Sequence, residues 1–221
     1  METSEFNASY TGQRDDILEL VPYGAKKVLD IGCSVGVLGQ LIKQKNAAEV
    51  VGIEVDAQMA KIAEQKLDNV IIGDIQKIKL DDFLLPNYFN CIIFADILEH
   101  LRDPWSILKK CEKFLANDGI IIASIPNVRH LHTIINLVFK GYWPYRERGI
   151  HDKTHLRFFA LKNIKELFQH AGLRIVKLER NYRFVEDEQH QYDKFAKYLG
   201  LFLMKNFFTF QFLIVAKKKD L

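Results

Sequence analysis

The stretch Asp30-Ile31-Gly32-Cys33-Ser34-Val35-Gly36 decides the fold, because it joins a short apolar run to a segment with helical spacing. Small residues at such a strand-to-helix turn let the backbone approach a ligand closely, and the start of the helix presents N–H donors. Gly32 and Gly36 are four residues apart, and Val37 occupies the third glycine position of a dinucleotide fingerprint. This spacing, with the carboxylate of Asp30 just before the turn, argues against a diphosphate ligand and an NAD-dependent oxidoreductase.

Apolar runs and helical patterns alternate on the C-terminal side of this turn. The runs are continuous rather than alternating, which is typical of strands buried on both faces of a parallel sheet. We expect strands at 27–31, 49–54, 70–72, 91–95, 120–125, 173–178 and 207–217. Helices are predicted at 37–44, 57–67 and 161–171, and a further helix opens at Asp103-Pro104. This order predicts a doubly wound α/β sheet.

Length and composition fit one domain over residues 1–221. The 221 residues can bury a core without disulfides, and a formal net charge of +3 is too small to indicate nucleic-acid binding. The 3 cysteines have no framework spacing, which favours a reducing compartment. The most apolar stretch, 199–215, is interrupted by polar residues, and the N-terminus lacks a signal-peptide pattern. We therefore predict a cytoplasmic protein without a membrane span.

Acidic residues follow the first three predicted strands. Asp30 precedes the glycine turn and suits an ammonium group, whereas Glu54, at the end of the second strand, can accept hydrogen bonds from ribose hydroxyls. Asp74, after the third strand, can accept from an adenine amino group. The ligand so described has an amino acid end, a ribose and an adenine, and it lacks a phosphate.

These residues resemble the class I S-adenosylmethionine (SAM)-dependent methyltransferases, whose motif is acid-x-Gly-x-Gly-x-Gly followed by an acid at the end of the second strand. Ser34 replaces the middle glycine. The resemblance implies SAM as cofactor, S-adenosylhomocysteine (SAH) as product, and a mostly parallel seven-stranded sheet with an antiparallel last strand. The implied cofactor-binding residues are Asp30, Gly32, Cys33, Ser34, Gly36, Glu54, Val55, Asp74, Ile75, Ala95 and Asp96, with Tyr10 and Arg14 closing over the cofactor.

Residues 126–157 form a basic, histidine-rich insertion after the fifth strand, where it can reach over the carboxyl ends of the sheet. Rings stack on sugar faces and arginine pairs with anions. We predict substrate binding by Trp143, Tyr145, Arg146, Arg148 and Arg157.

Histidine is the natural proton acceptor for this reaction, because its ordinary pKa leaves a neutral base at neutral pH. We expect His155 first and His151 second, with Asp152 orienting one of them, and His100 of the post-strand stretch 96–101 as the next candidate. Although His151, Asp152 and His155 have a spacing that could hold a divalent metal, no metal is predicted, because a convincing third ligand set is missing.

The stretches 125–130 and 149–159 look like a bacterial subgroup of these enzymes that is associated with polysaccharide and O-antigen biosynthesis. The resemblance implies methyl transfer to a hydroxyl or amine of a small molecule, first of all a saccharide or nucleotide-sugar precursor that is anionic or glycosylated. A quinone-type or other small metabolite is an alternative acceptor, and a non-catalytic SAM-binding regulatory module is an alternative function. Nucleic acid is not expected as a substrate, because a base-methylation motif is missing.

Overall fold

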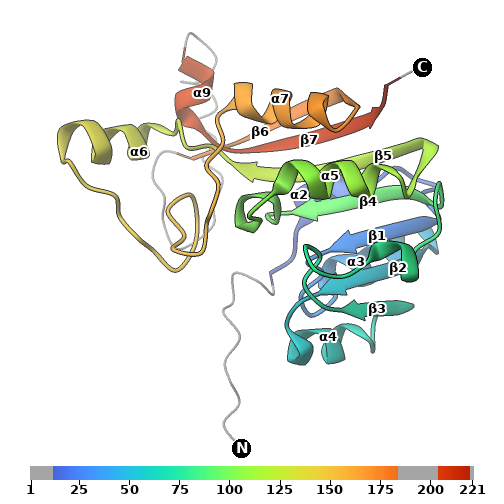
Figure 1. The fold of residues 1–221 in the computed structure, drawn as a ribbon. Coiled ribbons are helices and arrows are strands. Elements are labelled where there is room, and N and C mark those ends of the chain that lie inside the picture. Colours follow the sequence, from blue (N-terminus) through green and yellow to red (C-terminus); the bar gives the residue numbers. More distant parts are fainter. Residues whose placement is uncertain (1–11, 184–203, 220–221) are drawn as a thin grey trace, which may run out of the picture.

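The computed structural model describes residues 12–183 and 204–219. They build a 7-stranded sheet with the order β3-β2-β1-β4-β5-β7-β6 (Figure 1). The strands are β1 Lys27–Ile31, β2 Glu49–Glu54, β3 Asn69–Ile72, β4 Phe89–Ala95, β5 Leu115–Pro126, β6 Leu173–Tyr182 and β7 Thr209–Lys218. Pairs among the first five strands are parallel, and β7 pairs antiparallel to both β5 and β6. The predicted fold class is confirmed.

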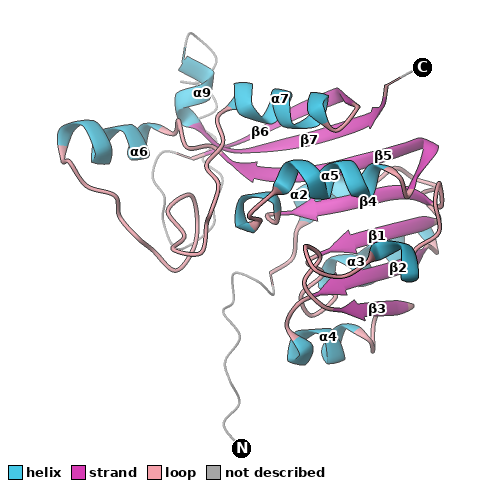
Figure 2. Ribbon diagram, viewed as in Figure 1, coloured by secondary structure: helices cyan, strands magenta, loops and turns pink. Residues whose placement is uncertain are grey.

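Helices cover both faces of this sheet (Figure 2). The α-helices are α2 Asp15–Leu20, α3 Val37–Asn46, α4 Ala57–Ala63, α5 Pro104–Glu112, α6 Leu131–Ile134, α7 Leu161–His170 and α9 Lys205–Phe208. The 3₁₀ turns η1 Leu80–Asp82 and η2 Leu98–His100 and the π-helical turn η3 Ile135–Phe139 complete the set. Among the described residues, no helix is long and apolar enough to cross a bilayer.

Neighbouring residues of each central strand bury their side chains on opposite faces. On β1, Leu29 packs into the cluster that α5 and α7 cover, whereas Val28 packs into the cluster beneath α2 and α3. On β4, Ile92 packs into the first of these clusters and Ile93 into the second. All four side chains are fully buried. Burial on both sides explains why these strands are continuous apolar runs in the sequence.

The ends of two helices follow the expected capping chemistry. The side chain of Asp56 accepts from the backbone N–H groups of Gln58 and Met59 at the start of α4, and Asp103 accepts from Ser106 N–H at the start of α5. Other boundaries differ from the prediction. β5 begins at Leu115, ahead of the predicted strand 120–125, and residues 207–208 belong to α9 rather than to the last strand.

The insertion leaves the sheet after β5, carries α6 and η3 outward, and returns to the carboxyl edge before α7 (Figure 1). Its return is fixed by two backbone hydrogen bonds, because the N–H groups of Leu156 and Arg157 donate to the carbonyl oxygen of Glu99 at 2.9 and 3.0 Å. Phe159 is buried in the core, whereas Phe158 is 46% exposed and packs edge-on against Trp143. The insertion therefore places its 151–157 stretch beside the end of β4.

Candidate functional site

A cavity of about 1200 Å³ lies at the carboxyl ends of β1, β2 and β4, where an open parallel sheet binds ligands. It contains many of the residues selected from the sequence: Arg14, Asp30, Gly32, Cys33, Ser34, Glu54, Val55, Asp74, Ile75, Ala95, Asp96, His100, Arg146, Arg148, Asp152 and His155. Residues from the glycine turn and residues from the insertion thus line the same space.

The glycine turn is held open by its backbone conformation. Gly32, Ser34 and Gly36 all have positive φ angles, of 72°, 50° and 76°. A side chain on Gly32 would stand 2.1 Å from the Cδ1 atom of Ile97, so glycine is required there for packing as well as for φ. Gly36 does not line the cavity; a side chain there would press on Ala63 of α4. Gly36 therefore allows the glycine turn to pack closely against α4.

Glu54 ties the glycine turn to the end of β2. Its Oε2 atom accepts from Ser34 N–H at 2.8 Å, and its Oε1 atom accepts from Val55 and Asp56 N–H at 2.8 and 2.9 Å. A carboxylate has about four acceptor positions, so one remains for a ligand hydroxyl while all three backbone bonds persist. The residue holds the loop in shape in addition to its predicted role toward a ribose.

Asp30 is nearly inaccessible to solvent, with 2% of its surface exposed. Burial, with the nearby Glu54 carboxylate, raises the pKa of Asp30 to about 7, while the Arg14 cation opposes the shift. Its charge therefore changes near neutral pH.

Asp96 lies at the end of β4 in a left-handed conformation, with φ of 56°. Its Oδ1 atom accepts from Ser124 Oγ at 2.9 Å and from the Gln211 side chain, and its Oδ2 atom pairs with Arg14. Arg14 also pairs with Asp16 of α2, so this guanidinium links α2 to the end of β4 in the lining of the cavity.

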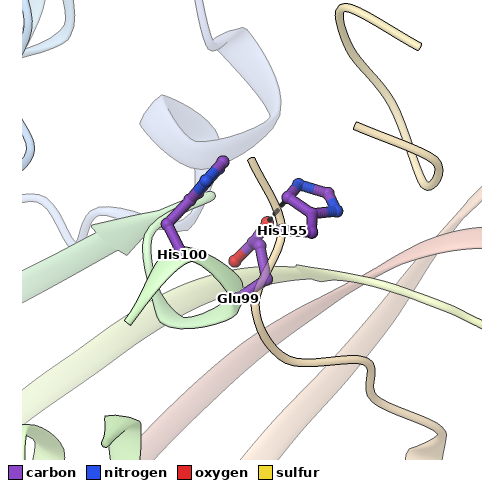
Figure 3. Close-up of side chains that lie close together, drawn as sticks. All are labelled: Glu99, His100 and His155. Atoms are coloured by element: carbon purple, nitrogen blue, oxygen red, sulfur yellow. Dashed lines mark ion pairs between the residues drawn. The ribbon is translucent and has the colours of Figure 1, made fainter. Parts of the chain in front are cut away.

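Glu99, His100 and His155 meet where the insertion returns to η2 (Figure 3). The Nε2 atom of His155 is 4.0 Å from Oε1 of Glu99, and the two histidine rings have centroids 4.7 Å apart. Burial, and next the Asp96 carboxylate, raise the pKa of Glu99 well above its usual range. Burial and the adjacent His100 lower the pKa of His155. We call these three residues the histidine–glutamate cluster.

The Nδ1 atom of each histidine ring in this cluster makes a hydrogen bond to a neighbouring residue. His155 Nδ1 lies 3.2 Å from the carbonyl oxygen of Ile150, which can only accept, so this nitrogen carries the proton. Thr154 Oγ1 donates to Asp152 Oδ1 at 2.6 Å and therefore accepts from His100 Nδ1 at 3.1 Å. Asp152 thus orients His100 through Thr154, rather than orienting His155 or His151 directly as the sequence suggested.

Several residues expected at the site lie elsewhere. His151 is fully buried with its Nε2 atom 3.2 Å from Thr133 Oγ1, and Trp143 packs on the ring of His151. Tyr145 is 74% exposed, and Arg157 donates to the carbonyl oxygen of Arg102 and covers Trp105. None of His151, Trp143, Tyr145 and Arg157 lines the cavity that the described residues form. Tyr10 lies outside the described residues.

The cavity also contains residues that sequence reasoning missed. Glu99 stands beside His100 in the 96–101 stretch, and a glutamate in the short turn after β4 is the available signal. Arg183, Phe210 and Gln211 reach the cavity from the ends of β6 and β7. No local motif marks these three, because the antiparallel pairing of distant strands brings them there.

A family model described as a methyltransferase domain matches residues 10–178. Among curated proteins, a ubiquinone biosynthesis O-methyltransferase of Neisseria meningitidis is 28% identical over 155 residues. That match covers 67% of this chain and 63% of the relative, so the chain spans less than two thirds of the relative's length.

Solved structures share the fold. A SAM-dependent methyltransferase of Archaeoglobus fulgidus superposes with a TM-score of 0.67 at 23% identity, covering 95% of this chain and 96% of the other. Magnesium protoporphyrin IX methyltransferase of Synechocystis, determined with bound SAH, superposes with a TM-score of 0.59 at 15% identity, covering 93% and 77%.

Replacing Glu54 by Gln should weaken binding of SAM by about 1.5–3 kcal/mol, because the charged acceptor of Ser34 N–H, which is also the acceptor predicted for the ribose hydroxyl, is lost. Glu49→Gln is the matched control, since Glu49 begins the same strand and pairs with Lys27 on the surface. Isothermal titration calorimetry measures both affinities. Equal affinity in Glu54→Gln and wild type would remove Glu54 from the cofactor site.

The affinity for SAM should rise with pH between about 6 and 7.5. In the role predicted for it, Asp30 attracts the cofactor ammonium only when ionised, and with a pKa of about 7 it is mostly protonated at pH 6. We expect roughly tenfold weaker binding one pH unit below that pKa. Asp30→Asn should bind weakly at every pH and lose the slope. A slope that persists in Asp30→Asn would assign the titration to another group.

Proposed function

This chain belongs to the methyltransferase domain family, and from that premise we propose that it transfers a methyl group from SAM to a hydroxyl oxygen of a small molecule. The sequence-based prediction of a methyltransferase is confirmed at the level of the family. The fold shared with SAM-dependent methyltransferases supports SAM as the cofactor. The 3 cysteines are free and buried, which fits a reducing cytoplasm.

The observation that carries the proposal is the continuity of the cavity. One part of its lining is built from Asp30, residues 32–35 and Glu54, which suit the amino acid and ribose of SAM. Another part is built from the histidine–glutamate cluster, which suits an acceptor hydroxyl. A bound cofactor would therefore present its methyl group toward polar groups that can accept or stabilise a proton.

The reaction demands alignment and the removal of one proton. The sulfonium leaves as a neutral thioether, so an acid is not needed on the leaving side. The acceptor hydroxyl must become more nucleophilic, and we assign this step to the histidine–glutamate cluster. Its two Nε2 atoms lack a proton, because Nδ1 is the protonated nitrogen of each ring.

The acceptor that the site favours is an aromatic hydroxyl of the quinone-precursor kind. Ile97, Leu101 and Phe210 give the cavity apolar walls, and the name of the Neisseria relative specifies O-methylation in ubiquinone biosynthesis. Arg146 and Arg148 supply positive charge for an acidic substituent.

A saccharide acceptor, the first expectation from the sequence, becomes the second candidate. The sequence predicts that Trp143 and Tyr145 bind the acceptor by stacking on a sugar face, but neither residue lines the cavity. The relatives give no support to the polysaccharide subgroup, since their names refer to ubiquinone biosynthesis. What still favours an anionic sugar is the arginine pair, which would serve a nucleotide-sugar phosphate equally well.

Incubation with methyl-labelled SAM and two acceptor panels tests this proposal. One panel holds hydroxylated aromatic acids and the other nucleotide sugars, and mass spectrometry locates the label. We expect label on an aromatic hydroxyl. Label on a sugar would select the second candidate, and SAM binding without transfer to either panel would favour the regulatory module.

His155→Ala should lower turnover about 10²–10⁴-fold while the dissociation constant for SAM stays unchanged, because the histidine acts on the acceptor rather than the cofactor. His170→Ala is the matched control, since His170 is exposed at the end of α7. Steady-state kinetics and calorimetry separate the two effects. Normal turnover in His155→Ala would place proton removal elsewhere.

A further inference from the structure

The carboxylate of Glu99 is buried without a hydrogen-bond partner among the described residues. The residue is 1% exposed, and neither Oε1 nor Oε2 accepts a hydrogen bond from any described residue. Buried carboxylates are normally hydrogen-bonded, paired or bound to a metal, because burial of an isolated charge is strongly unfavourable. The carboxylate of Glu99 therefore needs a partner that the described residues do not supply.

Two imidazole lone pairs complete a set of donors around this carboxylate. The Nδ1 atoms of His155 and His100 are protonated and held by the Ile150 carbonyl oxygen and by Thr154 Oγ1. Each ring therefore keeps an unprotonated Nε2. A histidine that donates its other nitrogen to a carbonyl or a carboxylate-linked group is the usual arrangement around a protein-bound metal.

The donor atoms are close enough to share one ion. One ligand atom from each of Glu99, His100 and His155 lies within 4.8 Å of the others, and the three side chains converge from η2 and the insertion (Figure 3). Ligands at metal bonds of about 2.0–2.2 Å stand about 3–3.5 Å apart, so movements of about an ångström would close the site.

We propose that Glu99, His100 and His155 bind one divalent transition-metal ion in the substrate half of the cavity. Two imidazoles and one carboxylate form a ligand set that leaves coordination positions open to other molecules. This site differs from the spacing noted in the sequence, because His151 faces Thr133 instead, and Asp152 serves as a support through Thr154.

The surroundings of the cluster favour a cation. The Asp96 and Asp152 carboxyl groups act on Glu99 together with its burial, and Arg14 is the neighbouring positive charge that opposes them. Arg14 itself pairs with Asp96 and Asp16. A divalent ion would offset the negative charge that gathers at the end of β4.

The role of the ion rests on the proposed function. An acceptor hydroxyl bound at an open position becomes more acidic, as metal-bound water does. With both Nε2 atoms on the ion, the cluster would activate the hydroxyl through the metal rather than accept its proton directly. The O–H bond would break, the proton would pass to water, and an oxygen lone pair would form the new bond to the methyl carbon. The electron pair of the broken carbon–sulfur bond stays on sulfur, which leaves neutral SAH.

Metal binding can be measured without turnover. The full chain is stripped with a chelator and titrated with Mn²⁺ and, separately, with Zn²⁺ in a calorimeter, with SAM and acceptor omitted. We expect one ion per chain, and at least tenfold weaker binding in Glu99→Gln and in His100→Gln. Glu166→Gln on α7 is the control and should bind like wild type, because its exposed side chain reaches toward Lys162.

Thermal unfolding adds a readout that is independent of the calorimetric titration. Mn²⁺ or Zn²⁺ should raise the melting temperature of wild type more than that of Glu99→Gln at the same ion concentration, because a tighter native-state site gains more from binding. The proposal is overturned if neither ion binds wild type, or if Glu99→Gln binds as tightly. An ion that binds this site in a chain lacking methyl transfer would contradict the proposed function while the metal site stands.

Discussion

The parallel pairing of β1 with both β2 and β4 is the constraint on which the rest of the structure depends. Ile31 of β1 is in register with Ile53 on one side and Phe94 on the other, so the three strands end at one level. Because both faces of these strands are buried, the chain can turn toward solvent at this edge without breaking the core. The residues after each strand end therefore gather around one cavity.

A second constraint brings the insertion to that edge. The carbonyl oxygen of Glu99 accepts from the N–H groups of Leu156 and Arg157, which positions His155 beside the carboxylate of the same glutamate. One residue thus uses its backbone to dock the insertion and its side chain to face the cavity. The chemistry that we assign to the cluster follows from this dual use, because neither segment alone would assemble the three donors.

The sequence predicted what depends on local pattern. The glycine turn, the acids after the strands and the helix caps at Asp56 and Asp103 could all be found, because spacing over a few residues determines each. The roles of residues in the insertion were harder to predict from the sequence. Trp143 and His151 looked chemically rich but pack on each other, whereas Glu99 looked ordinary and is buried at the cavity. Whether such a residue packs in the core or lines the cavity depends on long-range contacts, here those that bring the 151–157 stretch back to η2. The spacing of residues in the sequence does not reveal such contacts.

The central claim is that one cavity places the methyl donor against the histidine–glutamate cluster. A crystal structure of the full chain with SAH tests it most directly, because the sulfur atom marks the position from which the methyl group leaves. We predict the adenosine beside Glu54 and Asp74 and the sulfur turned toward His155 and Glu99, with room for an acceptor oxygen between them. SAH bound with its sulfur turned away from the cluster, or outside the cavity, would contradict the claim.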